Sequence, residues 1–146
     1  MDHSAPRIAI LGLGAIGRNL LVRIQSSILP GVQVAALVRA GSDAAAEPAQ
    51  GVDIFNDTDA LLHWKPDLAI ECAGHEVVRS VAPLLLQAGV DVIIVSLCVL
   101  GDAALRESLE AAARAGRAHW RGWASPGGAT ESLSGALLRV SARGAG

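Results

Sequence analysis

Residues 7–18 read Arg-Ile-Ala-Ile-Leu-Gly-Leu-Gly-Ala-Ile-Gly-Arg. An apolar run rich in β-branched residues ends in the pattern Gly-x-Gly-x-x-Gly, and a helical pattern follows at once through residues 19–24. A short apolar run that stops at glycine is typical of a buried strand, and the spacing after it is typical of an amphipathic helix. The segment therefore predicts a strand, a tight turn and a helix, in that order.

The spacing of the three glycines predicts a dinucleotide-binding turn. Gly12 lets the chain leave the strand in a backbone conformation that residues with a Cβ avoid, and Gly14 makes room for a pyrophosphate beside the main chain. Gly17 lets the helix pack close to the strand. The N–H groups of the first helical turn, at Ala15, Ile16 and Gly17, then face the phosphates with the positive end of the helix dipole. The alternative is that the glycines serve only a tight strand-to-helix turn.

The composition favours a parallel sheet covered by helices. The 146 residues are enough for one domain with a substantial core. Hydrophobic residues make up 51% of the chain but include one Phe, three Trp and no Tyr, which suits buried parallel strands better than a β-sandwich. We expect one α/β domain over residues 1–146, a Rossmann-like doubly wound parallel sheet.

Charge and hydropathy argue against two classes of partner. The formal net charge is −2 and the arginines are scattered along the sequence, so we expect no nucleic-acid binding. The apolar run of residues 90–100 is interrupted by Asp91 and Ser96, so it is too short to cross a bilayer, and residues 1–6 lack the features of a secretory signal. We expect a cytoplasmic protein without a membrane partner.

The two cysteines predict no metal site. Cys72 and Cys98 are not spaced as metal ligands, and both have apolar, strand-like flanks. We interpret them as buried, reduced thiols.

The predicted second strand, residues 32–38, ends at Arg39, which bears on the choice of cofactor. In the NAD-binding form of the motif, an acidic residue about 20 positions beyond the glycines accepts hydrogen bonds from the adenosine ribose. Here Arg39 stands near that place, and the nearest acid is Asp43. A guanidinium can pair with the 2′-phosphate of NADP or stack on adenine; the alternative is an ordinary solvated arginine. The expected cofactor is NAD or NADP, with the preference open.

The remainder of the chain is predicted to form further strand–helix units, which favour right-handed crossovers in a parallel sheet. The predicted strands are residues 51–56, 68–72, 91–96 and 118–123. The predicted helices are a short one capped by Asp57, one over 76–87, one over 103–114 capped by Asp102 and closed by Gly116, and one over 130–140.

A second group of candidate ligand-binding residues follows the later strands. Ligands of doubly wound sheets bind at the carboxyl ends of the strands, so Cys72, Ala73 and Gly74 fall where a nicotinamide ribose could lie. Ser96 can donate a hydrogen bond to a ribose or carboxamide, or cap its own turn. We interpret His75 as a cap or packing residue rather than an acid or base, because a helix N-terminus favours the neutral ring.

With these elements placed, the chain resembles the cofactor domain of the L-aspartate dehydrogenases, which oxidise aspartate to iminoaspartate with NAD or NADP in pyridine nucleotide synthesis. The resemblance runs from about residue 7 to residue 116. It is carried by Gly-Leu-Gly-Ala-Ile-Gly at 12–17, by Glu-Cys-Ala-Gly-His at 71–75, by Val95-Ser96, and by Ala-Ala-Ala-Arg-Ala-Gly at 111–116. The segment at 71–75 is the most specific of these motifs.

The sequence departs from that family from about residue 118. A Pro-Ser-Gly-Ala-type loop that helps seat the nicotinamide in the family is replaced by Trp-Arg-Gly-Trp-Ala-Ser-Pro-Gly at 120–127. The family also has a second domain that binds substrate, carries the catalytic histidine and supplies much of the dimer contact, so the resemblance implies a homodimer and no catalytic residue within this chain. We expect a shortened member that binds dinucleotide and turns over L-aspartate weakly or not at all. The alternative is a non-catalytic NAD(P)-binding module that senses cofactor or docks on a partner.

Overall fold

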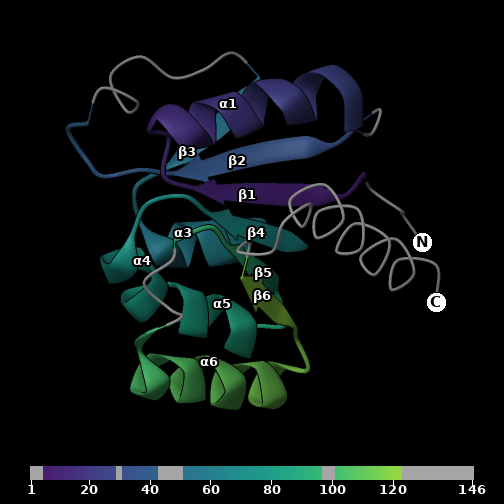
Figure 1. Cartoon of the computed structure of the whole chain (residues 1–146). Coiled ribbons are helices and arrows are strands. Elements are labelled where there is room, and N and C mark those ends of the chain that lie inside the picture. Colours follow the sequence, from purple (N-terminus) through teal and green to yellow (C-terminus); the bar gives the residue numbers. More distant parts are fainter. Residues whose placement is uncertain (1–4, 29–30, 43–50, 97–100, 123–146) are drawn as a thin grey trace.

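A computed structural model of the chain describes residues 5–28, 31–42, 51–96 and 101–122 (Figure 1). Within these ranges six strands form one sheet in the order β3-β2-β1-β4-β5-β6, and every neighbouring pair is parallel. The strands are β1 (Arg7–Leu11), β2 (Gln33–Leu37), β3 (Val52–Phe55), β4 (Leu68–Glu71), β5 (Asp91–Ile94) and β6 (Trp120–Gly122). Strands β2 and β3 are added on one side of β1 and strands β4 to β6 on the other, so the strand order reverses between β1 and β4. The predicted doubly wound Rossmann-like sheet is confirmed.

The helices lie on both faces of this sheet. They are α1 (Ala15–Arg23), continued by a π-helical turn η1 (Ile24–Ile28), then α3 (Thr58–Trp64), α4 (His75–Ser80), α5 (Ala82–Gln87) and α6 (Ala103–Gly116). Figure 1 shows α1 on one side of the sheet and α5 and α6 on the other. Asp57 caps α3 as predicted, accepting a hydrogen bond from the Asp59 N–H at 3.3 Å.

The alternation of side chains along the strands divides the core into two layers. Ile8 and Ile10 of β1 pack in the layer of α1, whereas Ala9 and Leu11 pack in the layer of α5 and α6. All four are fully buried, because both faces of a central parallel strand are covered. This explains why β1 is a continuous apolar run.

The predicted helix over residues 76–87 is wrong in one respect, because the structure has two helices there. α4 ends at Ser80 and α5 begins at Ala82, with Val81 between them at φ −106°. Pro83 lies in the first turn of α5 and has no N–H to give to the Arg79 carbonyl, which its ring also crowds. The proline therefore separates the two helices.

The predicted end of the helix after residue 103 is also corrected. α6 runs through Gly116, and Arg117 ends it in the left-handed region at φ 54°. A Cβ on Gly116 would overlap the Leu86 carbonyl oxygen and lie 2.8 Å from the Gln87 carbonyl carbon and oxygen. Gly116 thus allows α6 to lie close against α5, while Asp102 caps α6 as predicted by accepting from the Leu105 N–H at 2.9 Å.

The predicted last strand is present as β6, shorter than expected. Trp123 and the predicted helix over residues 130–140 lie outside the described residues.

Candidate functional site

The carboxyl ends of four neighbouring strands stand in one row across the sheet. Leu11 of β1 pairs with Leu37 of β2 on one side and with Glu71 of β4 on the other. Glu71 in turn pairs with Ile94 of β5. The residues that follow these four positions therefore emerge at one edge, where ligands of doubly wound sheets bind.

Five of the predicted ligand-binding residues lie within two positions of this row. Gly12 and Cys72 are each one residue past it, and Arg39, Ala73 and Ser96 are two residues past it. Backbone hydrogen bonds extend the pairing into this region: the Gly12 N–H donates to the Leu37 carbonyl and the Cys72 N–H to the Leu11 carbonyl, both at 2.9 Å. The structure brings residues that are widely separated in the sequence to the same edge.

The turn from β1 to α1 has the geometry predicted from its glycines. Gly12 has φ +96°, and a Cβ there would lie 2.8 Å from the Ala73 Cβ, so both conformation and space require glycine. A Cβ on Gly17 would overlap the Gly12 carbonyl oxygen, so this glycine sets the close approach of α1 to β1. Gly14 differs, because its φ of −79° suits any residue and a Cβ there would lie more than 4 Å from the other described residues.

The first turn of α1 is open at this edge. Gly14, Ala15 and Ile16 are exposed, Ile16 to 59%, and the N-cap residue Gly14 has no side chain with which to cap the helix. The first N–H groups of an α-helix have no partner within the helix, and the helix dipole adds a partial positive charge to them. Arg18 folds back over the turn and donates from Nε to the Leu13 carbonyl at 3.1 Å. An anionic group fits the chemistry of this turn.

Glu71 is a residue of this edge that the sequence reasoning did not single out as part of the site. Its side chain is fully buried at the end of β4. Oε1 accepts hydrogen bonds from the N–H groups of Ala73 (2.8 Å) and Gly74 (2.7 Å) and from the Ser96 hydroxyl (2.7 Å), and Oε2 accepts from the Ser96 N–H (3.1 Å). The available signal was an acidic residue at the end of an apolar strand.

This network bears on the interpretation of Ser96. The sequence left open whether its hydroxyl donates to a ligand or caps its own turn. In the structure the hydroxyl hydrogen is directed to Glu71, so Ser96 is tied to the neighbouring strand. Its hydroxyl oxygen keeps the capacity to accept a hydrogen bond.

Cys72 is half-buried beside Glu71. Burial, together with the charge of Glu71, raises the pKa of the Cys72 thiol from 9.0 to about 12. The raised pKa keeps the thiol protonated at neutral pH, while the side chain is half-buried and not buried as predicted. Cys98 lies outside the described residues.

Arg39 is exposed beyond the end of β2. The Val38 N–H before it donates to the Phe55 carbonyl at 2.8 Å, which fixes this strand end, and the Arg39 carbonyl accepts from the Ser42 N–H at 3.1 Å. Its guanidinium makes no ion pair with another residue of the described ranges. Asp43, the nearest acid in sequence, is not among the described residues.

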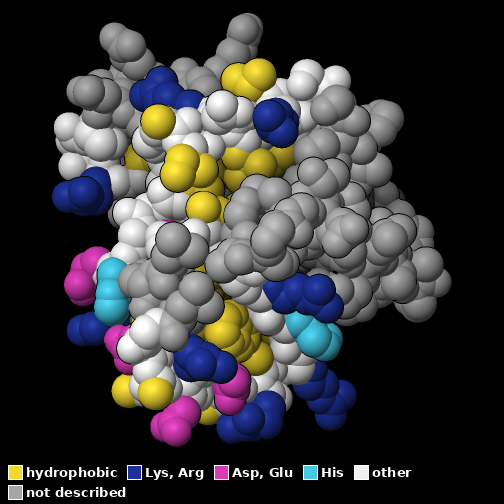
Figure 2. Space-filling view, in the orientation of Figure 1, with side chains coloured by type: hydrophobic (Ala, Val, Ile, Leu, Met, Phe, Trp, Pro, Cys, Tyr) yellow, Lys and Arg dark blue, Asp and Glu magenta, His cyan; other side chains and the backbone are white. Residues whose placement is uncertain are grey.

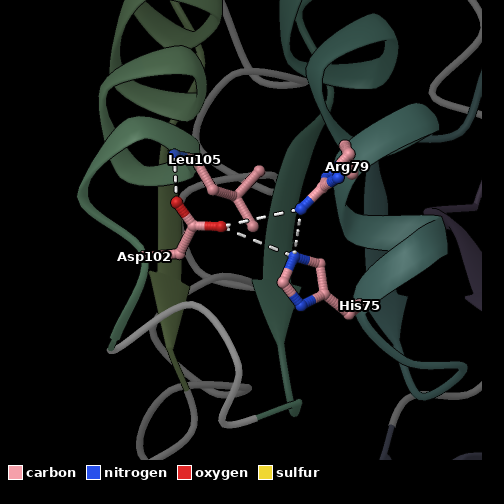
Figure 3. A network of polar contacts seen from close by, with 4 residues as sticks. All are labelled: His75, Arg79, Asp102 and Leu105. Carbon is pink, nitrogen blue, oxygen red and sulfur yellow. Dashed lines mark hydrogen bonds and ion pairs between the residues drawn. The ribbon is translucent and has the colours of Figure 1, made fainter.

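His75 lies in a polar cluster that joins the starts of α4 and α6 (Figure 3). Its Nε2 is 2.9 Å from the Arg79 guanidinium and 3.5 Å from the Asp102 carboxylate. Arg79 has only donors, so Nε2 of His75 is the acceptor in the shorter contact. Arg79 also lies 3.8 Å from Asp102, which caps α6. These contacts favour the packing role expected for His75.

Charged side chains of both signs lie on the visible surface of the domain. Figure 2 shows Lys and Arg side chains spread over the visible face, with acidic side chains and histidines among them in its lower part. In the described ranges no three or more His, Cys, Asp or Glu side chains gather as metal ligands would. None of the helices in the described part of the chain combines the length and apolar character that a bilayer span requires.

Comparison with known sequences identifies the family. The family described as the homoserine dehydrogenase NAD-binding domain matches residues 12–122, from the first glycine of the turn to the end of β6. The chain belongs to this family. The domain is also 39% identical over 127 residues to L-aspartate dehydrogenase 2 of Bordetella bronchiseptica, covering 87% of this chain and 46% of that protein. It is 40% identical over 111 residues to L-aspartate dehydrogenase of Ruegeria pomeroyi, covering 75% of this chain and 38% of that protein.

The resemblance to the L-aspartate dehydrogenases is therefore confirmed, and the domain is an aspartate dehydrogenase-like NAD-binding domain. It spans about half the length of the curated relatives it matches.

Solved structures agree on the fold. Aspartate dehydrogenase of Thermotoga maritima superposes with a TM-score of 0.58 at 22% identity, over 83% of this chain and 46% of that one. A biliverdin reductase of Synechocystis, solved with biliverdin and NADP+, gives a TM-score of 0.65 at 19% identity, over 80% of this chain and 37% of that one. At these identities the likeness shows the Rossmann-like fold.

Proposed function

We propose that this domain binds NAD or NADP across the carboxyl edge of its sheet and serves as the cofactor domain of an L-aspartate dehydrogenase. The observation that carries the proposal is the turn from β1 to α1, where Gly12 and Gly17 are sterically required and the space beside Gly14 is open. We assign the cofactor site to Gly12, Gly14, Ala15, Ile16, Gly17, Arg39, Cys72, Ala73, Gly74 and Ser96.

The proposed site has three parts along the edge. The first turn of α1 offers N–H donors to the diphosphate beside Gly14. The end of β2 offers the guanidinium of Arg39 to the adenosine end, where it would pair with a 2′-phosphate or stack on adenine. The ends of β4 and β5 face the nicotinamide riboside, the part of the cofactor that accepts or gives up a hydride. The exposed, uncapped start of α1 and the exposed Arg39 support this arrangement.

L-aspartate is the proposed substrate because the relatives that are 39% and 40% identical to this domain are named L-aspartate dehydrogenases. Oxidation of an amino acid at Cα needs a base for the amine proton, and an aspartate needs cationic partners for two carboxylates held close to the nicotinamide. We assign none of these roles to a described residue. We therefore expect this chain by itself to bind dinucleotide and to oxidise aspartate weakly or not at all.

Titration with NADH and NADPH, followed by the enhancement of nicotinamide fluorescence, tests the binding proposal. We expect saturable binding of at least one of them, and the absence of a complex with both would refute the proposal. Calorimetry with NAD+ in the presence and absence of L-aspartate then tests whether this chain also binds substrate. A change in NAD+ affinity on adding aspartate would show a substrate site on this chain, against the expectation above, and no change agrees with that expectation.

A further inference from the structure

Glu71 is a buried carboxylate whose partners come from two separate strand ends. A buried charge is tolerated only when hydrogen bonds replace its hydration, and Glu71 receives four. Two of them come from the turn after β4, at Ala73 and Gly74, and two come from Ser96 after β5. The carboxylate therefore cross-links two loops of the edge assigned above to the nicotinamide riboside.

The same network reaches the glycine turn through Ala73. A Cβ on Gly12 would lie 2.8 Å from the Ala73 Cβ and 3.0 Å from its Cα, so the turn after β4 packs directly against the turn after β1. Glu71 holds Ala73 in that place through the Ala73 N–H. Displacement of the Glu71 carboxylate would therefore alter the spacing between the two turns.

The network also determines the hydrogen-bonding character of this part of the edge. The N–H groups of Ala73, Gly74 and Ser96 and the Ser96 hydroxyl hydrogen are all directed to Glu71. What remains available to a ligand here is acceptor capacity, in backbone carbonyls and the Ser96 hydroxyl oxygen. Ribose hydroxyls and a carboxamide NH₂ can donate to such acceptors, whereas a phosphate cannot. The first turn of α1 has the opposite character, because it offers donors.

We propose that Glu71 is the positioning residue for the nicotinamide riboside half of the site, acting through the turns at Ala73–Gly74 and Ser96 without touching the ligand itself. This inference rests on the proposed dinucleotide binding. It adds that the site is divided into a donor part for the diphosphate and an acceptor part for the riboside, and that one buried carboxylate creates the second part.

Three single variants test the proposal. Glu71→Gln keeps the shape of the side chain, but its amide has one acceptor oxygen and one donor NH₂. In the wild type the Ser96 N–H donates to Oε2 at 3.1 Å. If the amide oxygen of Gln takes the place of Oε1, its NH₂ takes the place of Oε2, and two donors then face each other. Ser96→Ala removes the hydroxyl contact with Glu71 and also the hydroxyl oxygen left to a ligand, so amide exchange at Ala73 and Gly74, whose N–H groups donate to Glu71, separates the two effects. Asp91→Asn is the matched control, because Asp91 is also a buried carboxylate on this sheet, but it lies at the amino end of β5, where it accepts from the His119 N–H at 2.8 Å.

The experiment measures NADH affinity by fluorescence titration, stability by urea unfolding, and backbone amide exchange at residues 73, 74 and 96 in the wild type and each variant. We expect Glu71→Gln to raise the NADH Kd about tenfold and Ser96→Ala about threefold, with faster exchange at the three amides in Glu71→Gln. Asp91→Asn should change the NADH Kd by less than about twofold even where it lowers stability as much.

The outcomes separate this inference from the function on which it rests. A wild type that binds neither NADH nor NADPH refutes the proposed function, and the positioning role falls with it. A wild type that binds NADH, with Glu71→Gln and Asp91→Asn equal in affinity, refutes the positioning role alone. If Glu71→Gln does not fold, Ser96→Ala decides, and an unchanged Kd in that variant overturns the proposal.

Discussion

Substitution of Gly17 by alanine tests the glycine turn at its tightest point. A Cβ at this position would overlap the Gly12 carbonyl oxygen and lie 3.1 Å from the Gly12 carbonyl carbon and 3.6 Å from Ile10 Cγ2. The two closest atoms belong to the backbone, so no side-chain rotation relieves the overlap. The start of α1 must move away from β1 instead.

The expected cost follows from two opposing effects. Overpacking that forces a backbone shift costs up to about 3 kcal/mol, and the shift here loosens the contacts of Leu20 and Leu21 with the sheet. Alanine is better than glycine in a helix by about 1 kcal/mol, which offsets part of this. We expect a net loss of about 2 kcal/mol of unfolding free energy, or about 4–8 °C in Tm for a domain of this size.

Gly14→Ala is the matched control on the same turn. Its backbone conformation suits alanine, and a Cβ would meet nothing within 4 Å. Alanine lowers the entropy of the unfolded chain, which stabilises the fold by about 0.5–1 kcal/mol, but it is a poorer helix cap than glycine, which costs about the same. Stability should therefore stay within about 0.5 kcal/mol of wild type. The added methyl group occupies the place assigned to the diphosphate, so the NADH Kd should rise about tenfold.

Urea unfolding followed by circular dichroism, together with NADH titration, distinguishes the two variants. Gly17→Ala should lower the midpoint of unfolding without changing the denaturant slope, and Gly14→Ala should lose affinity without losing stability. Equal stability of Gly17→Ala and wild type would refute the steric argument for Gly17. Wild-type affinity of Gly14→Ala would refute the placement of the diphosphate.

The remaining predictions concern other parts of the fold and site. Gly116→Ala should lower the unfolding free energy by about 3 kcal/mol, because its Cβ would meet the Leu86 carbonyl oxygen at the contact between α5 and α6, and urea unfolding measures the loss. In a Cys98→Ser background, Cys72 should be alkylated by iodoacetamide far more slowly at pH 8 than an unfolded thiol, since a pKa of about 12 leaves a thiolate fraction of about 10⁻⁴, and a rate equal to that of the unfolded chain would contradict the burial argument. Because the raised pKa favours the protonated folded state, the contribution of Cys72 to stability should be complete below pH 9.0 and decline as the pH rises toward about 12. If the Arg39 guanidinium contacts a 2′-phosphate, Arg39→Ala should raise the NADPH Kd about tenfold and change the NADH Kd by less than about twofold. Equal effects on both dissociation constants would contradict that contact.

The sequence predicted those elements that depend on local chemistry. The β1 run is apolar because both of its faces are covered, and Gly12 is needed where the chain leaves the strand, so strand and turn are both visible within a dozen residues. The caps at Asp57 and Asp102 are local in the same sense, since each bonds an N–H two or three residues away. The division at Val81 was not predicted, although Pro83 gave a local signal for it, because proline cannot sit inside a helix without breaking a hydrogen bond.

Features that depend on a distant segment could not be predicted in this way. Gly116 was expected to close a helix because glycine is common there, but its role comes from the Leu86 carbonyl of another helix. Arg117 takes the left-handed position instead, which sequence preference alone does not favour. Helix contacts of this kind depend on how two elements cross, and no local pattern encodes the crossing.

The Glu71–Ser96 pair shows how the register of the sheet converts such distant residues into one site. The two residues are 25 positions apart, so no local sequence pattern predicts their contact. The pairing of Glu71 with Ile94 places Ser96 two residues beyond the strand end that lies beside the carboxylate. The sequence left open whether the Ser96 hydroxyl donates to a ligand or caps its own turn. In the paired sheet it donates to Glu71. A buried acid at the end of one parallel strand therefore indicates hydrogen-bond donors just after the end of the neighbouring strand. The strand order identifies which strand that is.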